Sequence, residues 1–83
     1  MIIAKWENLA ILLSIPTGYC QKSILRLDKI VENDSLIPDE WMATIVLLKS
    51  DSEVFVKGFG FSREMALKNI QEELNQMETQ WTQ

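Results

Sequence analysis

The chain has 83 residues, of which 47% are hydrophobic, so it is expected to form a single globular domain over residues 1–83 rather than a disordered segment. Its formal net charge of −4 argues against sequence-independent binding to DNA or RNA, which requires clustered Lys and Arg. The chain has no His, which removes the commonest general base and metal ligand. Its single Cys cannot form an internal disulfide, which favours a reducing compartment such as the cytoplasm.

The N-terminal part of the chain leaves its secondary structure open. Residues 1–6 fit a short strand, residues 7–14 fit one or two helical turns, and the apolar run 9–15 fits a buried strand equally well. Pro16-Thr17-Gly18 ends the element in either case. The apolar run is far shorter than the roughly 20 residues that a membrane-spanning helix needs, so no membrane partner is expected.

The segment 23–32 is predicted to be a strand. Leu25, Leu27 and Val31 alternate with charged residues, as in a strand with one buried face. A helix that begins at Ser23 is the alternative, because the apolar residues of the segment also share one helical face. The residues 32–40 are rich in Asn, Asp, Ser and Pro and predict a loop.

A β-hairpin is predicted next, with strands over 41–48 and 53–61 and a polar turn over 49–52. A turn of two or four residues would give the hairpin two apolar faces. One face carries Trp41, Ala43, Ile45, Leu47, Val54, Val56, Gly58 and Gly60. The other carries Met42, Thr44, Val46, Leu48, Phe55, Lys57, Phe59 and Phe61.

An amphipathic helix is predicted to follow the second hairpin strand. Ser62 has the chemistry of an N-cap, and Glu64 suits the positive end of the helix dipole. The residues of the apolar stripe recur at spacings of three and four: Ala66, Ile70, Leu74, Met77 and Trp81, with Leu67 beside them. We expect this stripe to pack over Gly58 and Gly60, which lack side chains and allow a close approach. The predicted fold class is therefore α+β, a three- to four-stranded antiparallel sheet with a C-terminal helix packed on one face.

Two families resemble this strand and helix, each over less than a third of the chain. The pattern Gly58-x-Gly60-x-Ser62-x-x-x-Ala66 resembles the last strand and last helix of double-stranded-RNA-binding domains. The pattern Ser62-x-Glu64-x-Ala66-Leu67-x-Asn69-x-x-Glu72-x-Leu74 is similar to the helix of HicB-type antitoxins. The first resemblance implies phosphate contacts by Lys57 and Arg63. That family has a basic pair after the Ser, whereas the acidic Glu64 follows Arg63 here.

Candidate catalytic and metal sites are weak. Cys20 beside Lys22 fits a thiol of ordinary reactivity better than a nucleophile, because the sequence offers no partner base. Asp39-Glu40 and Glu72-Glu73 fit solvated surfaces better than catalytic pairs. Adjacent residues on a helix point about 100° apart, so Glu72 and Glu73 do not converge on a substrate. We expect no enzyme activity, no cofactor and no metal site.

The second hairpin face is the strongest candidate for binding. Its aromatic side chains are of the kind that anchor interfaces, unless residues 1–20 cover them as ordinary core. The expected function is a small non-enzymatic protein-binding inhibitor or adaptor, of antitoxin-like or phage anti-defence type. The partner is expected to be a protein, with a nucleic-acid-binding protein and a second copy of the chain both left open. The alternative is an RNA-binding domain of the double-stranded-RNA-binding type. The candidate partner-binding residues are Phe55, Lys57, Phe59, Phe61, Arg63 and Trp81.

Overall fold

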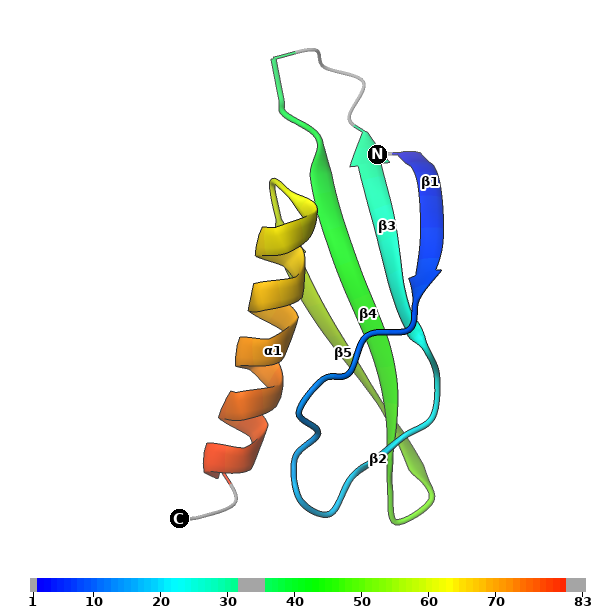
Figure 1. The fold of residues 1–83 in the computed structure, drawn as a ribbon, viewed down its shortest axis with the longest axis vertical. Helices are drawn as coiled ribbons and strands as arrows, with labels where there is room; N and C mark the ends of the chain where they lie inside the picture. The colour runs from blue at the N-terminus through cyan, green and yellow to red at the C-terminus, as the bar shows by residue number, and fades with distance from the viewer. Residues whose placement is uncertain (1, 32–35, 81–83) are drawn as a thin grey trace.

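The structure is a computed structural model that describes residues 2–31 and 36–80, with the backbone alone for 78–80. It consists of an antiparallel sheet followed by one helix, which confirms the predicted α+β fold (Figure 1). The elements in chain order are β1 (Ile2–Leu9), β2 (Cys20–Gln21), β3 (Leu25–Val31), β4 (Glu40–Lys49), β5 (Ser52–Gly60) and α1 (Arg63–Gln80).

The sheet is built around β4. The strand β3 pairs with β1 on one side and with β4 on the other, and β5 pairs with the opposite side of β4. The two-residue β2 also pairs with β4, on the side that β3 occupies, so β2 and β3 together act as one interrupted strand. Four of the strands, β1, β3, β4 and β5, correspond to the three or four that were predicted, and β2 is a fifth strand of only two residues.

The N-terminal segment resolves into a strand and a loop. The residues 2–9 form β1, whereas 10–19 form neither helix nor strand, so both assignments offered for the apolar run 9–15 were wrong. The loop packs on the helix side of the sheet, where Leu13 and Ile15 contact the core. The backbone N–H of Ser14 donates to Oε1 of Gln71 on α1 at 3.0 Å, and the Gln71 amide donates back to the Ser14 carbonyl at 3.2 Å. A helix side chain thus satisfies both backbone groups of Ser14, in place of the hydrogen bonds of a regular element.

The helix begins and packs as its sequence predicts. The Ser62 hydroxyl accepts a hydrogen bond from the backbone N–H of Met65 at 3.2 Å, which is N-capping. The stripe residues Ala66, Ile70 and Leu74 are fully buried, and Met77 is half-buried against the same core. Trp81, which was predicted to extend the stripe, lies outside the described residues. The helix stands along β5 (Figure 1).

The hairpin of β4 and β5 has the predicted register. A two-residue turn, Ser50-Asp51, joins the strands, and both residues have positive φ (50° and 68°), as in the type I′ turns that suit tight hairpins. Pairing is unbroken from Lys49 opposite Ser52 to Trp41 opposite Gly60. Gly58 and Gly60 consequently face α1, and the backbone of Ile70 lies directly over Gly58.

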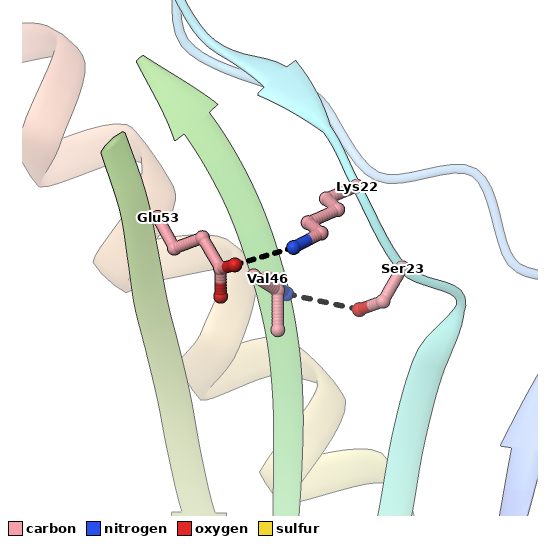
Figure 2. Close-up of polar contacts among 4 residues, drawn as sticks. All are labelled: Lys22, Ser23, Val46 and Glu53. Carbon is pink, nitrogen blue, oxygen red and sulfur yellow. Dashed lines mark hydrogen bonds and ion pairs between the residues drawn. The ribbon is translucent and has the colours of Figure 1, made fainter. Parts of the chain in front are cut away.

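A bulge joins β2 to β3. Gln21 faces Leu47 and Arg26 faces Thr44, so the four residues 22–25 lie opposite the two residues 45–46. The backbone N–H groups of Lys22 and Ser23 both donate to the carbonyl of Val46, at 2.8 and 3.3 Å. The Ser23 hydroxyl accepts from the Val46 N–H at 3.1 Å (Figure 2). A side chain therefore completes the ladder where the bulge interrupts it.

Removing this hydroxyl tests the bulge. Ser23→Ala should lower the free energy of unfolding by about 1–3 kcal/mol, because it leaves the half-buried Val46 N–H without its partner. The neighbouring change Lys22→Ala is the control, because it removes an exposed ion pair with Glu53 and should cost about 0–1 kcal/mol. Denaturant melts of both variants measure the difference. Equal stability of Ser23→Ala and wild type would contradict the role assigned to the hydroxyl.

Candidate protein-binding surface

The side of the sheet opposite α1 carries large apolar side chains, and we call it the open face. Its apolar residues come from four strands: Ile3, Trp6, Met42, Val46, Leu48, Phe55 and Phe59, together with Ile30, which is buried among its neighbours at 2% exposure. Three rings project from it, since Trp6 is 58%, Phe55 62% and Phe59 45% exposed. Soluble monomers rarely leave so many large apolar side chains together on one surface.

Residues 1–20, which the sequence offered as a cover for this face, do not lie over it where the structure describes them. Residues 2–9 extend the sheet as β1 and add Ile3 and Trp6 to the face. The loop 10–19 packs on the opposite side, against α1 and the core. Within the described part of the chain, the N-terminal segment therefore widens the open face instead of burying it.

The aromatic residues of β5 lie on the open face because of the glycines on its other side. Side chains alternate along a strand, so Gly58 and Gly60 against α1 place Phe59 on the opposite face. Lys57, two residues earlier, and Phe55, four residues earlier, lie on that same face. Lys57 lies between the two rings and forms no ion pair with any described residue. The β5 part of the face is thus two apolar anchors around one available cation.

Trp6 packs against an arginine that pairs with a buried carboxylate. Asp28 is only 2% exposed, and its Oδ1 accepts a hydrogen bond from Nε of Arg26 at 2.8 Å. The guanidinium of Arg26 lies over the Trp6 ring, 4.9 Å from its centroid. A buried carboxylate is stable only when it is paired, so this contact fixes Arg26, which in turn orients the ring. An interface anchor that is ordered before binding loses less entropy on association.

Arg63 belongs to a separate cluster on the helix side. It pairs with Glu7 through Nη2 and Oε1 at 2.6 Å, a contact too misaligned for a hydrogen bond, and its guanidinium is 5.9 Å from the centre of the Trp41 ring. The ammonium groups of Lys5 and Lys29 also approach the Trp41 ring, each at 5.8 Å. Because Arg63 is neutralised by Glu7 and Lys57 projects from the opposite face, the two residues do not join one surface for phosphates.

The remaining predicted site residues are scattered. Phe61 follows the end of β5 and is exposed, while Trp81 lies outside the described residues. Cys20 is a free, exposed thiol in β2. Asp39 pairs with Lys29 at 3.5 Å, and Glu72 and Glu73 are exposed on α1. Over residues 2–31 and 36–80 the structure contains neither a pocket nor a group of three residues able to hold a metal ion.

Sequence reasoning missed Trp6 and Ile3 as members of the surface. Trp6 is flanked by Lys5 and Glu7, which points to a strand with the ring on the face opposite the charges. Which face that is depends on pairing with β3, in which Trp6 lies opposite Asp28, and the local sequence does not contain that information.

Comparison by sequence and by structure gives no relative for this chain, since no family model, no curated protein and no solved structure matches it. The one described helix is not apolar enough to be a candidate membrane span.

Proposed function

We propose that this chain is a small non-enzymatic binding protein that acts as an inhibitor or adaptor by docking its open face on a protein partner. The observation that carries the proposal is the open face itself, where Trp6, Phe55 and Phe59 project from a hydrogen-bonded sheet. Aromatic residues on a preformed surface are the usual anchors of protein interfaces. An inhibitor of the antitoxin or phage anti-defence kind works by such occupation of a surface, and the sheet-and-helix layout of the two families noted above is compatible with it.

The charges of the open face favour a protein over a nucleic acid as the partner. Arg26 already forms an ion pair with Asp28, and Lys57 is the cation on β5 that remains available. One available cation neutralises too few phosphates for strong binding in a chain with a net charge of −4. The partner surface that fits is an apolar one that also presents a carboxylate to Lys57.

A matched pair of variants tests the proposal. Phe59→Ser removes an anchor from the open face, and Lys68→Ser changes an exposed residue on the other side of the molecule, on α1. Proteins captured from the native host by the immobilised wild type are identified, and the purified candidate is then titrated with each variant. We expect Phe59→Ser to weaken binding by about 30-fold or more, the effect of losing a hot-spot residue, and Lys68→Ser to bind like the wild type.

Two outcomes would contradict the proposal. A partner that binds Phe59→Ser as tightly as the wild type would place the interface elsewhere. Double-stranded RNA bound more tightly than about micromolar at physiological salt, with loss on Arg63→Glu, would favour the RNA-binding alternative. Melting curves of each variant show whether it is folded, so loss of binding is not confused with loss of structure.

A further inference from the structure

The two edges of the sheet differ in how they are protected. Edge strands expose unpaired backbone groups and are usually blunted by bulges, charges or proline. β1, at one edge, has a register shift between Ile3 and Lys5. β5, at the other edge, has nine residues without proline, pairs with β4 in unbroken register, and carries two charges of opposite sign, Glu53 and Lys57. The β5 edge is therefore the one that can accept another strand.

Hydrogen bonds made by β4 and α1 show which backbone N–H and C=O groups of β5 point away from β4 and remain unpaired. The N–H and C=O of Val46 are directed to Lys22 and Ser23, away from β5, so they do not bond Phe55, which lies opposite Val46. Alternation then directs the backbone groups of Glu53, Phe55, Lys57 and Phe59 outward. The side-chain amide of Asn69 donates to the Phe59 carbonyl, which confirms this direction and caps that end of the edge. The stretch with unpaired outward backbone groups is therefore 53–57.

We propose that two copies of this chain associate by antiparallel pairing of their β5 edges, with Phe55 opposite Phe55 of the second copy. This register uses all three outward-facing residues that Asn69 leaves free. It places Glu53 opposite Lys57 of the second copy on both sides of the two-fold axis, so each copy supplies one carboxylate and one ammonium group. Sliding one strand by four residues would instead place Lys57 opposite Lys57, which is repulsive. Glu53 already contacts Lys22 across β4 (Figure 2), and that contact can persist beside the new one.

Pairing of this kind has a consequence for the open face. Residues directly opposite each other in an antiparallel pair project to the same side of the sheet, so the two open faces would join into one surface, with both helices behind it. The two Phe55 rings would meet at the two-fold axis, each of them 62% exposed in the single copy. The inference does not rest on the proposed partner, because it is carried by the backbone edge of β5 and by the pairing of Glu53 with Lys57 between the two copies.

Charge reversal tests the register. Glu53→Lys and Lys57→Glu, made separately, each create two like-charge pairs in the homodimer and should raise its dissociation constant by about tenfold. An equimolar mixture of the two variants should form a heterodimer of about wild-type affinity, because both facing pairs are then complementary. The double variant should also recover the wild-type affinity. Sedimentation velocity over a concentration series measures all four samples.

A backbone variant tests the edge itself. Proline is tolerated on an edge strand where the N–H faces solvent, so Phe55→Pro should leave a folded monomer that does not dimerise at any concentration. A wild type that stays monomeric up to millimolar concentration would overturn the proposal. A dimer that Phe55→Pro leaves intact, or charge variants that fail to restore each other on mixing, would also overturn it. A monomeric wild type that still binds its partner through Phe59 would refute the dimer alone, whereas a dimer without such binding would refute the proposed function alone.

Discussion

Gly58→Ala should lower the free energy of unfolding by about 3 kcal/mol or more, the upper end of the cost of overpacking a core. A Cβ at this position would lie 2.7 Å from Cα of Ile70 and 2.8 Å from the carbonyl oxygen of Ala66, and closer still to the Ile70 backbone nitrogen. These are backbone atoms, which cannot turn away as the end of a flexible side chain can. The helix would have to move off β5, and the contacts of Ile70 and Leu74 would loosen with it.

Urea melts of Gly58→Ala and of the neighbouring Lys57→Ala, recorded on dilute protein, check this prediction. Lys57 projects from the open face on the same strand, so its replacement should cost under about 1 kcal/mol. A Gly58→Ala variant as stable as Lys57→Ala would mean that α1 does not pack on the glycines of β5. That result would undo the assignment of Phe55 and Phe59 to the opposite face.

Truncation of the helix stripe should have an effect of similar size. Ile70→Ala and Leu74→Ala should each cost about 2–5 kcal/mol, because both side chains are fully buried between α1 and the sheet. Lys68→Ala, an exposed position on the same helix, should stay within about 0.5 kcal/mol of the wild type. Losses below about 0.5 kcal/mol for both core variants would place the stripe in solvent and contradict the fold.

The C-terminal half of the fold could be predicted because its signals are local. Two glycines spaced by two, a serine cap and a stripe at helical spacing all lie within about twenty residues, and each one is satisfied in the structure. The two faces of the hairpin follow from its two-residue turn. Side chains alternate along paired strands, so the turn length determines the face on which each side chain lies.

The N-terminal half could not be predicted in the same way. The apolar run 9–15 is compatible with helix or strand, and contacts remote in sequence decide its conformation, such as that between Ser14 and Gln71. The contribution of Trp6 to the open face depends on Arg26 and Asp28, about twenty residues away. The aromatic residues of β5 could therefore be recognised from the sequence as candidates, whereas the Trp6 ring on β1, which lies on the same face, could not.

The most direct test of the central claim is hydrogen exchange of the chain, free and bound to its purified partner. Binding through the open face should slow the exchange of backbone amides in β5 and β1, around Phe59 and Trp6, and leave the solvent side of α1 around Lys68 and Glu72 unchanged. Protection confined to α1, with unchanged exchange around Phe59 and Trp6, would contradict the claim that the open face is the binding surface.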